Sequence, residues 1–328
     1  MPGPPLALEP LDIAMLRAMY REGGISLAGF DPRLNANRVA QTLRIGRARV
    51  AARLRLWRQS GFLSHYSVLV NPRLLGLIGG SVAIRCGSAK ERTEMLSRLK
   101  LVDGVVSAVE FLGHWVSVGV LAPDETTLKR RFDLLRSFCP SAAAQVEPLF
   151  LWNIPGPTRE LTPLDLRMIR ALRDRPTASL AEVAQRVGIS TRTMTRRYAA
   201  LLDDWAVWFS PVFNLRALVN PIVWIEATVE DNRTKAEVTR ALQAEYPHSL
   251  PMVQMPNASD PSVNSVLLIT ALPSVARLDD LEEFLASQPG VVAHETLVMV
   301  AMHDFPDWFD SHLNIFLLAP RRSVRKYP

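Results

Sequence analysis

The chain carries one sequence pattern twice, and this repeat limits the folds that it can adopt. Leu11–Met19 (LDIAMLRAM) matches Leu164–Leu172 (LDLRMIRAL), and Val39–Gln41 matches Val183–Gln185. Self-similarity on this scale in a 328-residue chain predicts a tandem duplication. The first pair of segments lies 153 positions apart and the second 144, so the first copy has nine additional residues. They fall in residues 23–38, where Gly and Pro predict a loop.

Each copy begins with the signals of three helices, which are clearest in the second copy. Thr162, Ser179 and Ser190 are residue types that cap helix N-termini, and Gly188 suits the end of the middle helix. The third helix is expected over Thr191–Asp203. Two short helices joined by a turn that contains Gly predict a helix-turn-helix, whose second helix enters the major groove of DNA.

A β segment follows the third helix in each copy. Trp205–Asn214 and Tyr66–Val70 are rich in aromatic and β-branched residues, which favour strands. Each copy is therefore expected to end its DNA-binding unit in a wing hairpin, as in a winged helix-turn-helix.

The segments between these units predict small α+β domains with the order βαββαβ, which is ferredoxin-like. In the first, the expected elements are Ser81–Arg85, Lys90–Lys100, Val105–Phe111, Trp115–Leu121, Glu125–Phe138 and Gln145–Leu151. In the second, they are Val223–Val229, Lys235–Glu245, Pro251–Met255, Val266–Ala271, Leu278–Ser287 and Val291–Val300.

The fold class is thus α+β, with two winged helix-turn-helix domains alternating with two ferredoxin-like domains. The expected boundaries are 1–75, 76–153, 154–218 and 219–328. The second helix-turn-helix domain includes a Pro- and Gly-containing linker at its start. The last domain ends in an amphipathic helix that contains Trp308, Phe309, Leu313 and Phe316, followed by a basic tail.

The net charge also alternates along the chain, from one expected domain to the next. Residues 1–75 carry a net charge of +7 and residues 158–218 a net charge of +4. The intervening residues 76–157 carry +1, and residues 219–328 carry −6. A polyanion such as double-stranded DNA would therefore meet the first and third segments.

This arrangement resembles the Lrp/AsnC (feast/famine) family of prokaryotic transcription regulators. The resemblance rests on Leu164–Leu172, Ser179–Ser190 and Thr191–Arg197 in the second copy, and more loosely on Asp31–Arg33, Gly61-Phe62 and Asn71–Gly76 in the first. Family members usually hold one copy and pair through their effector domains. The resemblance therefore implies a covalent pseudo-dimer with two ferredoxin-like sheets packed on each other and a small-molecule effector. Whether two chains associate further into a homo-oligomer stays open.

The effector is left unassigned, because the chain departs from the family at one turn. The family's effector domain usually has Gly-x-x-Asp after its second strand. The first copy has Gly113–Val116 there, without the Asp, and the second has Asn257–Asp260, without the Gly.

Helical geometry separates the side chains of the two recognition helices into faces. In the second copy, Arg192 and Arg196 lie opposite the apolar stripe of Met194, Tyr198 and Leu201. The flanking positions are Thr191, Thr193, Thr195 and Arg197. Arg pairs in a bidentate manner with guanine, and Thr contacts bases or phosphates. These six residues are the predicted DNA contacts of the second copy.

The first recognition helix lies in Arg44–Ser60, which holds six arginines and no acid. Its stripe is Val50, Leu54 and Trp57, and the positions opposite are Ala48 and Ala52. The predicted DNA contacts are the arginines on the flanks and near the far face, which are Arg47, Arg49, Arg53 and Arg55. Such flanking arginines suit phosphates, so we expect this copy to supply affinity and the second copy to read bases. The alternative is a degenerate helix kept for packing.

Other classes of function find less support. No apolar run reaches the ~20 residues of a membrane span, and the N-terminus does not read as a signal peptide, so a cytoplasmic location is expected. Cys86 and Cys139 lack metal-ligand spacing and are expected to be reduced, and His303–His312 suits a polar helix face better than a metal site. The sequence shows no phosphate loop and no nucleophile–base pairing, so we expect no cofactor and no enzyme activity.

Two alternatives stay open. One is an architectural protein with vestigial DNA-binding helices. The other is an enzyme that resembles the siroheme decarboxylases, which share this architecture and are in some cases tandem fusions. Those enzymes normally have a His- and Tyr-rich stretch at the second and third strands of the effector domain. The corresponding stretch here, Glu110–Val120, has one His and no Tyr.

Overall fold

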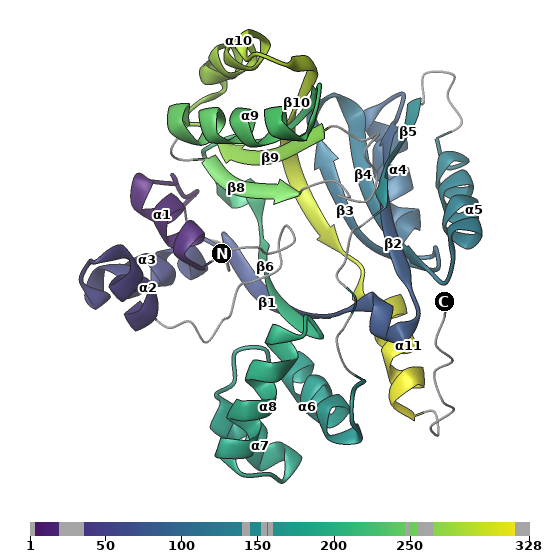
Figure 1. The fold of residues 1–328 in the computed structure, drawn as a ribbon. Coiled ribbons are helices and arrows are strands. Elements are labelled where there is room, and N and C mark those ends of the chain that lie inside the picture. Colours follow the sequence, from purple (N-terminus) through teal and green to yellow (C-terminus); the bar gives the residue numbers. More distant parts are fainter. Residues whose placement is uncertain are drawn as a thin grey trace.

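The fold was analysed in a computed structural model, which describes residues 4–19, 36–139, 145–151, 156, 160–246, 249–254 and 265–318 (Figure 1). Four segments discussed above lie wholly or mostly outside the described residues: the predicted loop at 23–38, the linker at 153–159, the turn at 257–260 and the basic tail after 320. No helix in the described ranges has the length and apolar character needed to cross a membrane.

The first half has the predicted order of elements. Its helix-turn-helix unit is α1 (Pro10–Met19), α2 (Ala36–Leu43) and α3 (Arg47–Gln59), followed by β1 (Leu63–Val70). Its effector unit is β2 (Ile78–Arg85), α4 (Ala89–Leu99), β3 (Val105–Phe111), β4 (Trp115–Ala122), α5 (Glu125–Arg136) and β5 (Gln145–Leu151).

The second half repeats this order. Its helix-turn-helix unit is α6 (Pro163–Asp174), α7 (Leu180–Val187) and α8 (Thr191–Asp203), followed by β6 (Val207–Phe213). Its effector unit is β7 (Ile222–Val229), α9 (Asn232–Glu245), β8 (Ser249–Gln254), β9 (Ser265–Ala271), α10 (Leu278–Ser287) and β10 (Val291–Asp304). The expected amphipathic helix follows as α11 (Pro306–Leu318), and its Phe309 and Leu313 are buried.

Both effector units have the ferredoxin-like strand order, and they are joined edge to edge. The combined eight-stranded sheet runs β5-β2-β4-β3-β10-β7-β9-β8. The junction is β10, a 14-residue strand that pairs with β7 over Val291–Met299 and with β3 over Met299–Asp304. This strand is longer than the sequence indicated, because its second part finds its partner in the other half of the chain.

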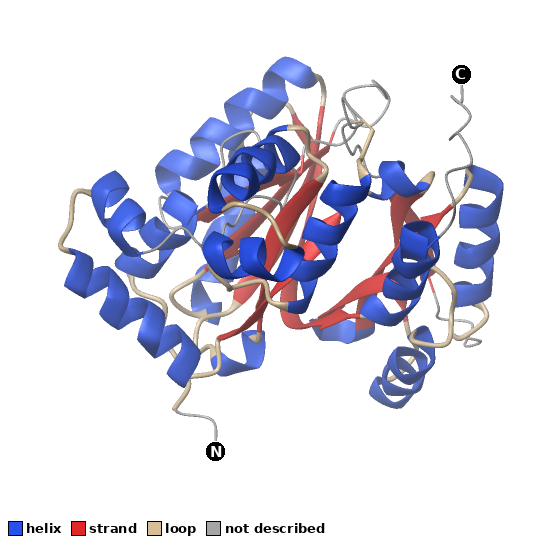
Figure 2. Ribbon diagram, turned by 90° about the horizontal axis from the view of Figure 1, so that it is seen from below, coloured by secondary structure: helices blue, strands red, loops and turns tan. Residues whose placement is uncertain are grey.

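Each part of the sheet has one face covered by helices. Met95 and Leu128, from α4 and α5, are buried in one cluster with the β2 and β4 side chains, and α9 and α10 cover β7 in the same way. On the other face, the rings of Phe111 on β3 and Trp224 on β7 lie 5.7 Å apart in a T-shaped contact across the junction strand β10. The two effector units thus form one continuous sheet through a hydrogen-bonded edge, where the sequence led us to expect two sheets packed on each other (Figure 2).

The prediction of a wing hairpin in each copy is wrong. β1 and β6 pair with each other in an antiparallel two-stranded sheet, which we call the inter-half ladder. Its ends are matched: the Asn71 backbone N–H donates to the Ala206 carbonyl at 3.0 Å, and Asn214 N–H donates to the Phe62 carbonyl at 2.8 Å. Strand propensity in each segment was read correctly, but the partner lies in the other half rather than in an adjacent turn.

The helix-turn-helix units are also exchanged between the halves, as Figure 1 shows. Residues of α1–α3 share a buried cluster with Ile222, Ile269 and Met299 of the second effector unit. Residues of α6–α8 share one with Val68, Leu77 and Leu121 of the first half and with α11. Each helix-turn-helix unit therefore packs on the effector unit of the opposite half.

Candidate nucleic-acid interface

Side-chain caps fix where the helices of the second unit begin. Thr162 and Asp165 form a capping box at α6, and Ser179 and Glu182 form one at α7. Ser190 caps α8 by accepting the backbone N–H of Thr193 at 3.2 Å. These caps satisfy N–H groups that a helix leaves unpaired at its N-terminus, and they were read correctly from the sequence.

The helix-turn-helix turn uses a left-handed residue at the same place in both copies. Gly188 has φ 77° in the second copy, and Arg44, 144 positions earlier, has φ 54° in the first. The following backbone N–H groups bond alike, from Ile189 to Ala184 and from Ile45 to Ala40, each at 3.0 Å. The turn geometry is thus the same even though only one copy has the glycine that favours it.

The recognition helix α8 is docked by one face and exposed on the other, as predicted. Met194 and Leu201 are fully buried, and Tyr198 is 5% exposed. The exposed face carries Thr191, Arg192, Thr195 and Arg196, with Thr193 partly exposed beside them. Within the described part of the chain, neither Arg192 nor Arg196 forms an ion pair, so both guanidinium groups are free to meet a ligand.

Arg197 is the exception among the predicted contacts of α8. Its Nη1 donates to Asp165 Oδ1 at 3.0 Å and to Thr162 Oγ1 at 3.1 Å, which ties α8 to the start of α6. Asp165 is completely buried. Burial acts to raise the pKa of the Asp165 carboxyl, but the hydrogen bonds from Thr162 and Arg197 outweigh it and hold that pKa below its ordinary value. The structure therefore gives Arg197 a place in the packing of the unit.

The recognition helix α3 presents a denser positive surface. Val50 and Trp57 are fully buried, whereas Arg47, Arg49 and Arg55 are exposed. Arg44 and Arg58 are exposed as well, and none of these five arginines has an ion-pair partner among the described residues. Ala48 and Ala52 are exposed, as the helical geometry predicted.

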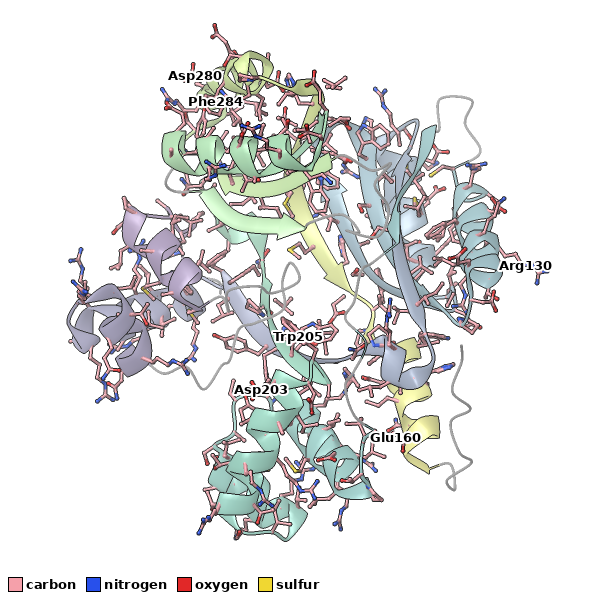
Figure 3. The ribbon with its side chains drawn as sticks, in the orientation of Figure 1. Arg130, Glu160, Asp203, Trp205, Asp280 and Phe284 are labelled. Atoms are coloured by element: carbon pink, nitrogen blue, oxygen red, sulfur yellow. The ribbon has the colours of Figure 1, made fainter. Side chains whose placement is uncertain are left out.

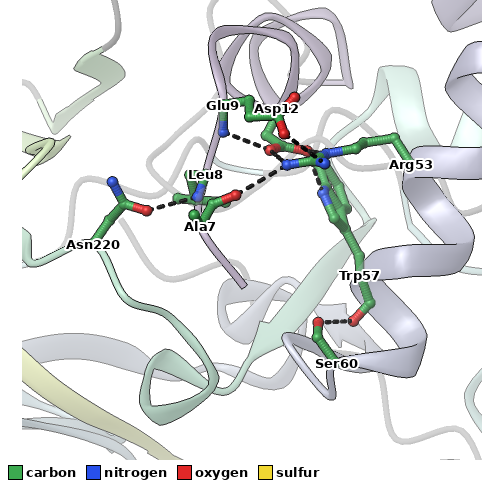
Figure 4. Close-up of polar contacts among 8 residues, drawn as sticks. All are labelled: Ala7, Leu8, Glu9, Asp12, Arg53, Trp57, Ser60 and Asn220. Carbon is green, nitrogen blue, oxygen red and sulfur yellow. Dashed lines mark hydrogen bonds and ion pairs between the residues drawn. The ribbon is translucent and has the colours of Figure 1, made fainter. Parts of the chain in front are cut away.

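Arg53 does not belong to this free set, although the sequence placed it there (Figure 4). Its guanidinium is paired with the Asp12 carboxylate, with Nε donating to Oδ1 at 2.5 Å, and with Glu9 at 3.2 Å. It also donates to the carbonyl of Ala7 at 3.0 Å. The hydrogen bond to Asp12 is the main reason why the pKa of Arg53 is raised. Trp57 completes the cluster by donating from Nε1 to Asp12 Oδ1 at 2.6 Å.

The two internal arginines form equivalent pairs in the two copies. Asp12 and Asp165 are the second residues of the matched segments, and Arg53 and Arg197 are 144 positions apart. Each pair joins the first helix of its unit to the recognition helix. The sequence does contain a signal for these pairs, because both copies have an aspartate at the same position of the first helix and an arginine at the same position of the third. Helical geometry within a single element does not show that the two residues meet.

Figure 3 shows the outer ends of the two helix-turn-helix units, which point away from the rest of the molecule. Nitrogen-tipped side chains project there, whereas Asp203 and Trp205 lie at the other end of α8, toward the centre of the molecule. No group of three or more His, Cys, Asp or Glu side chains in the described ranges is arranged to hold a metal ion. His303 and Asp304 end strand β10 and do not lie on the expected polar helix face, which holds only the residues on α11. His303 Nε2 lies 2.6 Å from Oε1 of the buried Glu110, and the His312 ring lies against Trp308.

Comparison with known proteins matches the second unit to a described domain. The profile of the AsnC-type helix-turn-helix domain covers residues 161–202. We call residues 161–202 the AsnC-type domain, after the profile that they match. This match confirms, for the helix-turn-helix unit of the second copy, the resemblance to the Lrp/AsnC family that the sequence indicated. The domain contains α6, α7 and α8, with all six of the predicted contacts of the second copy.

One of the solved structures similar to this chain spans nearly its whole length. The siroheme decarboxylase NirDL in complex with an iron-uroporphyrin III analogue is 13% identical, with a TM-score of 0.51, over 94% of this chain and 100% of that chain. AsnC from E. coli is 21% identical, with a TM-score of 0.31, over 48% of this chain and 99% of that chain. A feast or famine regulatory protein from M. tuberculosis, complexed with L-methionine, is 20% identical, with a TM-score of 0.32, over 47% and 99%. No curated protein sequence matches the chain.

The AsnC-type domain thus carries two exposed arginines on the outer face of α8 that have no ion-pair partner among the described residues. Arg192 and Arg196 are one helical turn apart, so both side chains leave the same face. Of the ten predicted contacts, eight lie on the surface or partly exposed without an ion-pair partner, and Arg53 and Arg197 are paired inside their units.

Proposed function

We propose that the protein is a sequence-specific DNA-binding transcription regulator of the Lrp/AsnC type, in which one chain acts as a pseudo-dimer, and that it is not an enzyme. The observation that supports this proposal is α8 of the AsnC-type domain, with Arg192 and Arg196 exposed and unpaired opposite a fully docked face. Arginine on a recognition helix reads guanine through its O6 and N7 atoms.

The two recognition helices are proposed to have different roles, with α3 binding phosphates and α8 reading bases. α3 has four exposed arginines and Arg44 precedes it, all without acid partners among the described residues, and alanines stand at its far positions, so it suits phosphates. α8 has arginines at the far positions and threonines beside them, so it suits base edges. Because the helices differ, the preferred operator is asymmetric rather than palindromic. A small-molecule effector is part of the proposal, and its chemical class is left unassigned.

The inter-half ladder supports the pseudo-dimer. Both DNA-binding units follow directly into strands of one small sheet, and that sheet relates them by matched hydrogen bonds at its two ends. A dimeric regulator places two recognition helices through an interface between chains. Here the equivalent interface lies within one chain.

The decisive experiment is selection of bound fragments from the source genome at a stated salt concentration, followed by binding measurements on the selected sequence. Arg192→Ala should cost about 1–3 kcal/mol at the selected site and relax its preference for one base pair. Arg130→Ala is the matched control, because Arg130 is exposed on α5 at an edge of the molecule, away from both units (Figure 3). It should leave the ranking of fragments unchanged. Failure to enrich any sequence, or equal losses from both variants, would contradict the proposal.

A second candidate is an enzyme similar to a siroheme decarboxylase. It is favoured by the fold match to NirDL, which spans 94% of this chain, whereas a single-copy regulator spans about half. Titration with an iron porphyrin distinguishes the two candidates. A saturable shift of the Soret band, together with no sequence-selective DNA binding, would favour the enzyme.

A further inference from the structure

The two cysteines of the chain, which are 53 positions apart, lie in contact inside the first effector unit. Cys86 directly follows β2, and Cys139 lies just beyond the end of α5. Their Sγ atoms are 3.0 Å apart. Both side chains are buried, at 2% and 3% exposure. Two thiols held this close need only a small approach to form a covalent bond.

The surroundings keep the two sulfurs together. Met95 of α4 lies behind them, with its Sδ 3.7 Å from Cys86 Sγ and 3.5 Å from Cys139 Sγ. The backbone on each side is also fixed, because Cys86 N–H donates to the His114 carbonyl at 3.1 Å and Cys139 N–H donates to the Arg136 carbonyl at 3.2 Å. Three elements therefore converge on a pocket of sulfur atoms, which contains neither a metal cluster nor a third thiol.

We propose that Cys86 and Cys139 are a peroxide-sensitive thiol pair that oxidises to an intramolecular disulfide. The oxidant is hydrogen peroxide or a small organic hydroperoxide, and a dithiol reverses the reaction by exchange. The bond would join the end of β2 to the end of α5. The second effector unit holds no cysteine, so the modification acts on one half only.

The chemistry balances as a two-electron oxidation. The Cys86 thiolate attacks one oxygen of hydrogen peroxide, the O–O bond breaks, and the departing hydroxide takes up the proton released by Cys86 to form water. Cys86 is then a sulfenic acid. The Cys139 sulfur attacks the Cys86 sulfur, the S–S bond forms, the S–O bond breaks, and the hydroxide leaves with the Cys139 proton as a second water.

The roles of the two thiols follow from their environments. The hydrogen bond from Cys139 lowers the pKa of Cys86 in spite of its burial. The same hydrogen bond, together with burial, raises the pKa of Cys139. Cys86 is therefore the thiol that reacts first, as a thiolate, and Cys139 keeps its proton until it resolves the sulfenic acid.

The experiment uses the full-length reduced protein treated with hydrogen peroxide, then denatured, alkylated and digested with trypsin. The expected result is a linked pair of peptides, Cys86–Lys90 joined to Ser137–Arg159, and an intact mass lower by two hydrogen atoms before digestion. The thermal midpoint should rise on oxidation and fall back after treatment with dithiothreitol. Each of these changes should be absent in Cys86→Ser and in Cys139→Ser.

Met95→Leu is the matched control for packing, since it removes the third sulfur but keeps the thiol pair. It should still give the linked peptides. The proposal is overturned if both cysteines stay alkylatable after peroxide treatment, if they gain oxygen without linking, or if the linked peptides come only from disulfide-bonded dimers on a non-reducing gel.

Discussion

At the scale of single residues, arginines of the recognition helices have two different fates. Arg192 and Arg49 are exposed without an acid partner, whereas Arg53 and Arg197 meet buried aspartates from another helix. A buried carboxylate without a cation is costly, so each pair is needed once its aspartate is inside. The arginines that suit DNA are therefore those whose helix face has no buried acid within reach.

The Asp165–Arg197 pair predicts an acid-sensitive fold. The pKa of Asp165 is below its ordinary value in the folded chain, so the carboxylate contributes stability above about pH 4 that is lost as pH falls through the folded pKa. Asp165→Asn should lower the free energy of unfolding by about 3 kcal/mol at neutral pH and flatten its decline in acid. Urea unfolding at a series of pH values measures both effects.

Asp174→Asn is the control for this prediction, because Asp174 forms a salt bridge with Arg186 in which both side chains are about half exposed. Exposed pairs contribute only about 0–1 kcal/mol. An equal loss of stability in the two variants would show that the burial of Asp165 has no special effect.

Two arginines one turn apart on α3 should behave differently when they are replaced. Arg49→Ala should reduce the slope of log K against log salt by about 1, because it removes one phosphate contact, and it should leave stability nearly unchanged. Arg53→Ala should instead destabilise the protein by about 3 kcal/mol, since it leaves Asp12 buried and unpaired. Fluorescence anisotropy over a salt series and thermal unfolding separate the two. A similar salt effect from both variants, with both stable, would count against the assignment of Arg53.

The sequence predicted the exposed set well, because exposure on a helix follows from its own periodicity. Arg192, Arg196, Arg47 and Arg49 all lie where the apolar stripe placed them. Ion pairs between helices do not follow from that periodicity. They depend on how α1 crosses α3 and how α6 crosses α8, which is a property of packing, so Arg53 and Arg197 could not be excluded from their own helices alone.

At the scale of elements, the turn of the helix-turn-helix is the same in both copies but is built from different residues. Gly188→Ala should cost about 1 kcal/mol, because a side chain resists the left-handed backbone. No atom lies within 4 Å of the added Cβ, so the cost comes from the backbone alone. Arg44→Gly should have the opposite sign and stabilise the protein by about 0.5 kcal/mol. Glycine removes the strain of the left-handed backbone, but it loses more conformational entropy on folding, so the gain is small. Thermal midpoints of the two variants test this, and a loss from Arg44→Gly would contradict it.

Local signals decided most elements, and long-range pairing decided the rest. Capping residues and glycines predicted where the helices begin and end, because capping interactions join residues that are only a few positions apart. The prediction of wing hairpins was wrong because the sequences of β1 and β6 favour a strand without specifying its partner, and the two strands pair with each other. The predicted end of β10 at Val300 was too early for the same reason. The strand continues to Asp304 because it pairs there with β3, which lies about 190 positions away in the sequence.

At the scale of the whole molecule, exchange of the helix-turn-helix units makes each half depend on the other. The clusters around α1–α3 and α6–α8 both contain residues from the opposite half, and the ladder and the β3–β10 junction add backbone hydrogen bonds. Apolar burial and strand pairing on this scale should hold the halves together even without a covalent connection.

A protease site inserted between residues 157 and 158 tests this dependence. After cleavage, the two fragments should elute together in gel filtration and unfold in one cooperative transition. The uncut insertion variant is the control for the insertion itself. Separate elution of two folded fragments would mean that the exchanged packing contributes little.

The ladder between β1 and β6 also bears on how such a regulator would respond to its own abundance. A regulator that must first dimerise loses occupancy steeply when copies become few, because the binding-competent species depends on the square of the monomer concentration at high dilution. In the proposed regulator both helices would reach DNA on one polypeptide, so operator occupancy should follow the first power of copy number. Halving the gene dose would then halve the bound complex at low occupancy, and an operator read in this way has a direction as well as a sequence.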